Sequence, residues 1–123
     1  MILTIQTSAK NELLDITEKV KKSLDKSRTT VTVYVPHTTA AITINENADP
    51  TVKQDILAKL DGLVPQDDNY RHAEGNSDGH IKASLMGASV TIPVIDGKLA
   101  LGTWQGIFFC EFDGPRERRV VIS

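Results

Sequence analysis

The segment Ile107–Phe112, with the sequence IFFCEF, is almost continuously apolar. Successive side chains of a β-strand point to opposite faces of its sheet. A strand with apolar residues at consecutive positions therefore needs cover on both faces. We expect this segment to be a strand that is buried on both faces.

Shorter β patterns lie on both sides of this segment. Thr29–Pro36 (TTVTVYVP) is rich in β-branched residues and places its three valines on one face. Asp96-Gly97 is a two-residue hairpin signal, because both positions favour a positive φ. Further strands are expected at residues 2–7, 13–14, 40–45, 88–95 with a break at Pro93, 98–102 and 116–123.

Three segments carry helix signals. Asp15-Ile16-Thr17-Glu18 has the spacing of a capping box, which predicts a helix that ends near Ser27. Asp49-Pro50 combines an N-cap residue with proline at the first helical position, and Gly62 marks the end of that helix. A third helix is expected from about Gly79 to Met86, with Ser77 or Asp78 as its N-cap.

These elements predict one α+β domain over residues 1–123, with seven or eight strands in a mainly antiparallel sheet or sandwich and about three helices. A net charge of -2, from 14 basic and 16 acidic residues, gives no basis for general nucleic-acid binding. The single cysteine, Cys110, excludes an intrachain disulfide framework and is expected to be a buried, inert thiol. The absence of a signal-peptide pattern and of long apolar runs predicts a cytoplasmic protein without membrane spans.

Polar and ligand-capable groups are concentrated in Tyr70–Met86 (YRHAEGNSDGHIKASLM). This stretch contains His72 and His80, two of the three histidines, and His37 follows a predicted strand. Three imidazoles near a carboxylate could bind zinc or another transition ion. The usual close spacings of metal-binding histidines are missing, so spacing alone favours separate surface or capping histidines.

The loop Gly75–Gly79 opens the third helix, where free backbone N–H groups can bind an anion. Asp78 would repel a phosphate there unless a cation lay between them, so an ordinary capped helix start is the simpler interpretation. Glu46, at a junction of strand and helix, has no evident structural role and is the better functional candidate. Arg116 and Arg118 follow a turn and have the geometry to bind phosphate or carboxylate. Trp104 could stack on a planar ligand or fill an apolar contact.

Three long motifs resemble one family of proteins. Their segments are His37-Thr38-Thr39-Ala40-Ala41 with Asn45-Glu46-Asn47 and Asp49-Pro50, His72 to Lys82, and Gly102 to Ile107 with Glu111 to Arg116. In this order they closely resemble the YjbQ family, whose members are known as secondary thiamine-phosphate synthases. The resemblance covers essentially the whole chain.

The resemblance implies a compact α+β fold with a β-sandwich-like core, a homotrimer, and a polar site near the subunit boundary where the histidines gather. It implies His80, Asp78 and Glu46 as catalytic residues and His37, His72 and His80 as metal ligands. Residues that would bind the substrate or its anion are Thr38, Asn76, Ser77, Trp104, Arg116 and Arg118.

The implied activity joins a hydroxymethylpyrimidine diphosphate to a thiazole phosphate and releases pyrophosphate. Its cofactor would be a divalent ion, either zinc-like at the histidines or magnesium with the diphosphate. Three histidines around one ion also suit metal-activated water, so a metal-dependent hydrolase of a small phosphorylated or amide compound is an alternative. A trimeric metal- or small-ligand-binding protein without turnover is another.

Overall fold

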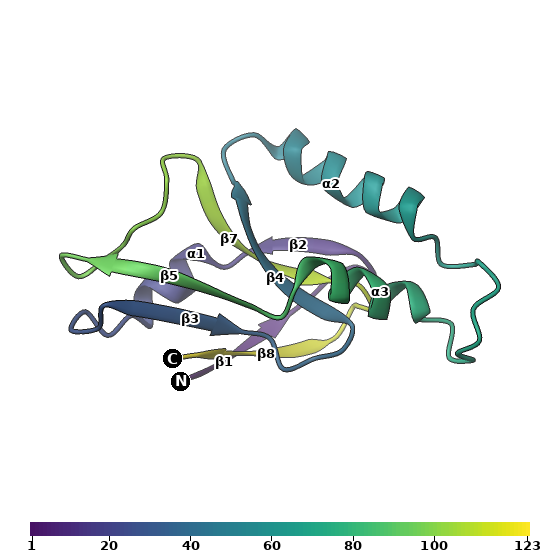
Figure 1. The fold of residues 1–123 in the computed structure, drawn as a ribbon, viewed down its shortest axis with the longest axis horizontal. Helices are drawn as coiled ribbons and strands as arrows, with labels where there is room; N and C mark the ends of the chain where they lie inside the picture. The colour runs from purple at the N-terminus through teal and green to yellow at the C-terminus, as the bar shows by residue number, and fades with distance from the viewer.

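The computed structural model describes residues 1–123, which form eight strands and three helices (Figure 1). The strands are β1 (Ile2–Gln6), β2 (Glu12–Asp15), β3 (Thr30–Tyr34), β4 (Ala40–Glu46), β5 (Ser89–Ile95), β6 (Lys98–Leu99), β7 (Gln105–Glu111) and β8 (Glu117–Ile122). The helices are α1 (Thr17–Lys22), α2 (Pro50–Leu63) and α3 (Ser77–Met86). None of them combines the length and apolar character that crossing a membrane requires.

Two antiparallel sheets form the core. One has five strands in the order β1-β8-β3-β5-β6, and the other has three in the order β2-β7-β4. Every strand pair is antiparallel. The predicted α+β class, with a mainly antiparallel sandwich-like core and three helices, is therefore confirmed.

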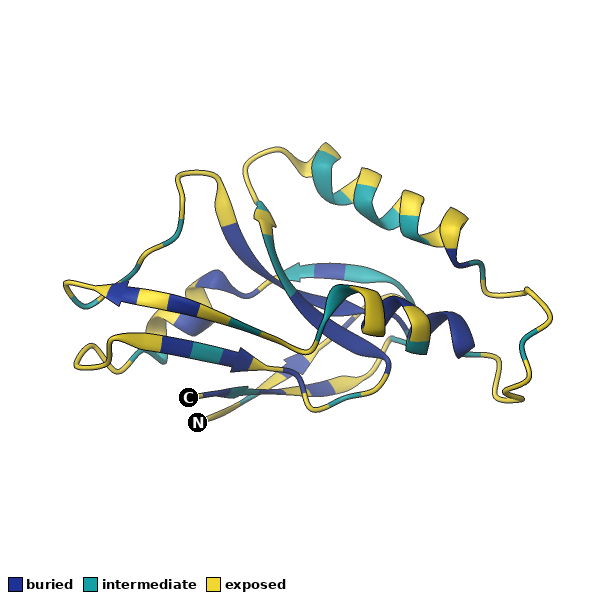
Figure 2. Ribbon diagram, in the orientation of Figure 1, coloured by how far each residue is buried: buried dark blue, intermediate teal, exposed yellow.

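Strand β7 is buried on both faces, as its sequence predicts (Figure 2). Ile107 and Phe109 belong to a cluster of 14 buried apolar residues that lies between the two sheets. Phe108 and Cys110 belong to a second cluster of 6, which partly buried residues of α2 and α3 cover. Burial raises the pKa of the Cys110 thiol to about 12, so the thiol is inert at neutral pH.

Helix α2 begins as predicted, but it is only loosely attached to the core. The Asp49 carboxylate accepts a hydrogen bond of 2.9 Å from the backbone N–H of Thr51, and Pro50 is the first helical residue. Its apolar residues, such as Ile56 and Leu60, pack against the second cluster while remaining partly exposed. No residue of α2 is fully buried.

Helix α1 is shorter than predicted, because it ends at Lys22 rather than near Ser27. The Asp25 carboxylate accepts the backbone N–H of Ser27 at 3.0 Å and holds a turn there instead. The predicted capping box is also wrong. Asp15 is the last residue of β2, and its carboxylate accepts the N–H of Thr17, two residues later.

The sequence predicted a break in β5 at Pro93, but the strand continues through this residue. Val94 N–H donates to the Thr29 carbonyl at 2.8 Å, and the Pro93 carbonyl accepts from Ala100 N–H at 2.9 Å on the opposite side. The Pro93 nitrogen therefore points away from β3 and toward the short edge strand β6. Proline is tolerated in that position because no ladder bond to β3 is lost. The predicted hairpin follows, with φ values of 51° at Asp96 and 73° at Gly97.

Helix α3 begins earlier than predicted and lies very close to the end of β7. Its N-cap residue is Asn76, and Ser77 and Asp78 are its first helical residues, which corrects the predicted cap. Asp78 lies inside the helix and so is not its cap, and its Oδ2 contacts two lysines instead. A Cβ added to Gly79 would lie 2.9 Å from the Phe112 carbonyl oxygen, so glycine permits this close approach.

Candidate functional site

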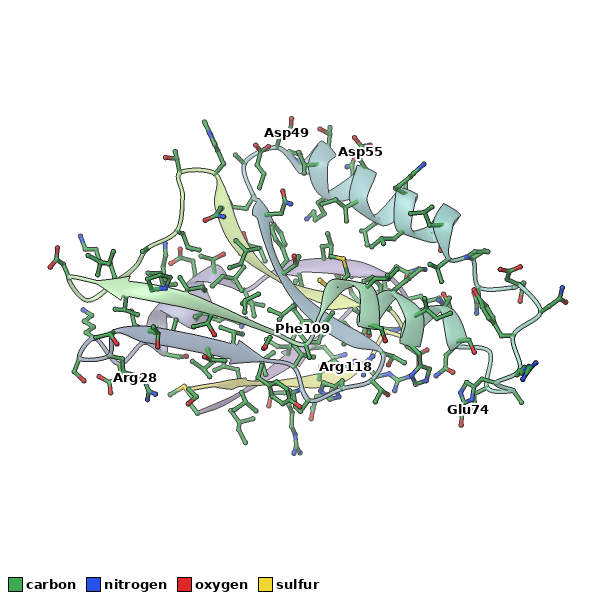
Figure 3. All side chains as sticks on the ribbon, in the orientation of Figure 1. Arg28, Asp49, Asp55, Glu74, Phe109 and Arg118 are labelled. Atoms are coloured by element: carbon green, nitrogen blue, oxygen red, sulfur yellow. The ribbon has the colours of Figure 1, made fainter.

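A hollow of about 380 Å³ lies where the segment after β3, the start of α3 and the turn between β7 and β8 meet. We call it the polar cavity, because no hydrophobic residue lines it. Figure 3 labels two of its residues, Glu74 and Arg118. Its lining residues are Pro36, His37, Thr38, Thr39, Glu74, Asn76, His80, Asp113, Arg116 and Arg118.

Arg118 is a buried arginine in the wall of the polar cavity, with 3% of its surface exposed. Its Nε donates to Glu111 Oε1 at 2.9 Å, and its Nη2 donates to the other carboxylate oxygen. Nη2 also donates to Thr39 Oγ1 at 2.8 Å. These bonds fix the guanidinium in one orientation. Nη1 has no partner within the chain and remains free to donate to a ligand.

Glu111 is the fixed partner of this arginine and is fully buried. Burial alone would raise the pKa of its carboxyl group. Hydrogen bonds from Arg118 and Thr7 and from the N–H of Asp113 outweigh that effect and hold the pKa below its ordinary value. The pair is therefore ionised at neutral pH, with its charges balanced.

Arg116 and Asn76 complete the wall around Asp113. Arg116 Nη2 lies 3.2 Å from Asp113 Oδ2, and Asn76 Nδ2 donates to the same oxygen at 2.9 Å. Asn76 Oδ1 is buried and has no partner. Glu111 already balances Arg118, so Glu74 and Asp113 face only the charge of Arg116, and the cavity presents directed N–H donors rather than a positive charge.

His37 is held as a neutral imidazole. Its Nε2 accepts the backbone N–H of Arg119 at 2.9 Å, so Nδ1 carries the proton in the neutral form. Burial, followed by the positive charge of Arg118, lowers the pKa of His37. At neutral pH it can therefore donate one hydrogen bond through Nδ1.

The other two histidines lie next to each other. The ring centroids of His72 and His80 are 5.3 Å apart, and His72 Nε2 lies 3.7 Å from Glu74 Oε2. His80 also lines the polar cavity, beside His37. No group of three or more His, Cys, Asp or Glu side chains is arranged to hold a metal ion, and His37 Nε2 is already bonded. The histidines of one chain therefore do not fit a metal as they stand.

Asp78 lies outside the polar cavity and is completely buried. Its Oδ2 contacts Lys10 Nζ at 2.6 Å and Lys82 Nζ at 3.3 Å, and Lys82 Nζ continues to Asp61 of α2 at 3.0 Å. We call these four residues the lysine network. Ser77 is also buried and lines a separate hollow beside His72 and His80.

Glu46 and Trp104 lie far from the polar cavity. Glu46 is the last residue of β4 and pairs with Gln105, and Asn47 N–H donates to the Trp104 carbonyl at 3.0 Å. The seven residues of β4 separate this end from Thr39, which corresponds to about 20 Å of strand. One chain brings Thr38, Asn76, His80 and the arginines together, but not Glu46 or Trp104.

Two important charges, Glu111 and Lys82, were not predicted from the sequence. Glu111 is the only charged residue in the apolar segment Ile107–Phe112, and such a charge needs a buried partner. That signal could have led to Arg118, across the turn. Lys82 gave no comparable signal, because a lysine in a helix is usually exposed.

Comparison with known proteins matches residues 1–123 to the family described as UPF0047 protein YjbQ-like. The chain belongs to this family. The UPF0047 protein MJ1081 of Methanocaldococcus jannaschii is 54% identical over 122 residues, which cover 97% of this chain and 88% of the relative. UPF0047 protein YugU of Bacillus subtilis is 50% identical and covers 98% of this chain and 95% of its own length.

Solved structures of similar proteins have the same fold. A crystal structure from Clostridium acetobutylicum has a TM-score of 0.97 and 53% identity, covering 100% of this chain and 98% of its own. A protein from Thermus thermophilus has a TM-score of 0.95 at 41% identity, with coverages of 100% and 98%. None of these names states a thiamine-phosphate synthase activity, so the family is established and the activity is a matter for proposal.

Proposed function

We propose that the polar cavity binds the phosphate groups of a small substrate and that the protein is a transferase of the thiamine-phosphate synthase type. The observation that carries this proposal is the fixed guanidinium of Arg118, whose Nη1 is unpaired in a cavity without apolar residues. A donor that is held in place before binding loses little entropy when it binds an anion.

The proposed reaction joins two ring systems. The bond between the methylene carbon of hydroxymethylpyrimidine diphosphate and its diphosphate oxygen breaks, and pyrophosphate leaves with the electron pair. The thiazole nitrogen of the second substrate forms a bond to the same carbon, which gives thiamine phosphate. The protein would assist chiefly by stabilising the charge of the departing pyrophosphate.

Three groups of the polar cavity can stabilise this charge. Arg118 Nη1 and Arg116 would donate to oxygens of the diphosphate, and His37 Nδ1 would donate a further hydrogen bond. Asn76 would act through its Nδ2, which holds the Asp113 carboxylate in the same wall. His80, which lines the same cavity, would be a second imidazole near the reacting atoms.

The divalent ion that this reaction needs would enter the cavity bound to the diphosphate substrate. Glu74 and Asp113 line the cavity and would otherwise repel a diphosphate. A resident zinc-like ion at His37, His72 and His80, which one chain does not gather around a single position, stays a prediction that metal analysis of the purified protein tests. Stoichiometric metal that persists in the His72→Ala variant would contradict that ligand set.

We also propose self-association into a homotrimer. Ile2 and Tyr34 both lie opposite Val121 in the sheet register, so the three form one row on the outer face of the five-stranded sheet. Ile2 is 62% exposed and Tyr34 is 45% exposed in the single chain. Exposed apolar rows of this kind often mark contacts between proteins. Light scattering of wild type and Tyr34→Lys tests this, and a monomeric wild type would contradict it.

Binding of pyrophosphate by titration calorimetry, with magnesium present, tests the proposed function. The Arg116→Ala variant should bind pyrophosphate about tenfold more weakly, because it loses a charge-assisted contact. Arg116 is half exposed, so the variant should fold. Arg28→Ala is the matched control, since this arginine lies away from the cavity (Figure 3), and its affinity should be unchanged.

Formation of thiamine phosphate from the two substrates tests turnover separately. The wild type should form product, and Arg116→Ala should lose activity while Arg28→Ala keeps it. A protein that binds no pyrophosphate would contradict the proposal as a whole. Pyrophosphate binding without any product would indicate a ligand-binding protein and not a transferase.

A further inference from the structure

A second hollow adjoins the polar cavity. It has a volume of about 550 Å³, within the usual range for small-molecule sites. Two histidines and Thr38 line both hollows, so the two spaces share one wall. We call the second space the small-residue hollow. Its lining residues are His37, Thr38, Ala40, His80, Ala83, Ser84, Gly87 and Ala88.

Backbone hydrogen bonds hold the walls of the small-residue hollow in place. Val35 N–H donates to the Ala88 carbonyl at 2.8 Å, and Ile42 N–H donates to the Gly87 carbonyl at 3.1 Å. The joint between α3 and β5 is therefore bonded to the end of β3 and to β4. Ala40 and Ala83 are buried, so residues packed in the core form this wall of the hollow.

The two hollows differ in chemistry. Arginines and carboxylates line the polar cavity, whereas no lysine, arginine, aspartate or glutamate lines the small-residue hollow. A phosphate in the second hollow would therefore have no cationic partner. Small apolar side chains leave room for a flat, uncharged group, and Ser84 and Thr38 supply hydroxyls at its edge.

We infer that the small-residue hollow binds the uncharged organic ring of the ligand whose phosphate groups occupy the polar cavity. Arg118, the residue that carries the proposed phosphate-binding function, marks where the anionic end of that ligand would lie. His37 and His80 then lie at the junction of ring and phosphate. This inference rests on the proposed phosphate-binding function and adds the subsite for the ring.

Two ligands that differ only in the ring test the inference. Inorganic pyrophosphate should occupy the polar cavity alone, while hydroxymethylpyrimidine diphosphate should occupy both hollows. We expect the wild type to bind the second compound at least about tenfold more tightly, since burial of a ring adds apolar contact. Titration calorimetry of both compounds, with magnesium present, measures this ratio.

The Ala88→Leu and Ser84→Leu variants should remove the advantage of the ring. Both positions are exposed, so a leucine would fill the hollow without overpacking the core. Binding of pyrophosphate should stay within about twofold of wild type. Ala58→Leu, at an exposed position of α2, is the control and should leave both affinities unchanged.

The outcomes separate the inference from the function on which it rests. If the wild type binds neither compound, the proposed function fails. If it binds both equally, or if both filled variants keep the preference for the ring compound, phosphate binding stands and the ring subsite is wrong. A preference that both leucine variants abolish, and Ala58→Leu retains, supports the subsite.

Discussion

The protein contains two buried charge clusters that look alike but differ in one respect. Glu111 with Arg118, and Asp78 with Lys82, each place a fully buried carboxylate against a buried cation. Arg118 keeps a free nitrogen in the wall of the polar cavity, whereas the Asp78 carboxylate lies outside it. The first arrangement suits ligand binding, and the second connects α3 to α2 and to the segment before β2.

The geometry of the cations explains the difference. A guanidinium can donate hydrogen bonds to both oxygens of one carboxylate and still have an N–H group left for a ligand. The ammonium group of Lys82 contacts both Asp61 and Asp78, which belong to different helices. A buried charge is therefore no sign of function by itself. The direction of the donor that remains unpaired decides whether the cluster can bind a ligand.

The largest expected effect is that of Arg118→Met. This change leaves Glu111 buried without its cation and should lower the free energy of unfolding by about 3–5 kcal/mol. It should also abolish pyrophosphate binding in the folded fraction. Urea denaturation and calorimetry at a temperature where the variant is folded measure both. A variant that binds pyrophosphate like wild type would contradict the role given to Nη1.

Lys82→Met should destabilise the protein less and leave binding intact. Asp78 would keep Lys10 as a partner, so the expected loss is about 2 kcal/mol, the scale of a charged hydrogen bond. Pyrophosphate affinity should stay within about twofold of wild type. Urea denaturation and calorimetry give the two values. A loss of affinity similar to that of Arg116→Ala would show that the two clusters are not separate.

Acid should affect the polar cavity through His37. Because the fold lowers the pKa of His37, the unfolded chain binds a proton more readily than the folded one. The stability that neutral His37 contributes is complete above pH of about 6.5 and is lost as the pH falls through the folded pKa. Unfolding of wild type and His37→Gln at pH 7.5 and lower measures it. The two proteins should differ in slope, and parallel curves would contradict the assignment.

The smallest effect is expected for an ion pair at the surface. Glu18 and Lys21 lie 3.2 Å apart on α1, with both side chains at least half exposed. Lys21→Ala should change the free energy of unfolding by no more than about 0.5 kcal/mol. Urea denaturation checks this value. A loss as large as that of Lys82→Met would mean that burial does not set the scale of these effects.

The sequence predicted the fold better than it predicted the site. Strand β7 was predictable because its apolar run has only one stable environment, and Asp49-Pro50 and Asp96-Gly97 act through local backbone chemistry. The predictions for Pro93 and for the end of α1 were wrong. At Pro93 the outcome depended on which side of β5 faces the edge strand, and at the end of α1 it depended on a competing turn.

The candidate site depends on contacts between residues distant in the chain, which spacing does not encode. His37, His80 and the arginines were expected together from the family resemblance, and the fold places them around one cavity. Glu46 and Trp104 belong to the same family motifs but lie at the other end of β4. Asp78 was expected to act on a ligand, and it is buried by two lysines instead.

A crystal structure of the protein with pyrophosphate and magnesium tests the central claim most directly. We predict pyrophosphate in the polar cavity, with an oxygen about 3 Å from Arg118 Nη1 and a second contact from Arg116. The chain offers a rival anion site at its other end, where Lys21, Lys26 and Lys98 line a separate hollow. Pyrophosphate bound there, with none beside Arg118, would contradict the account.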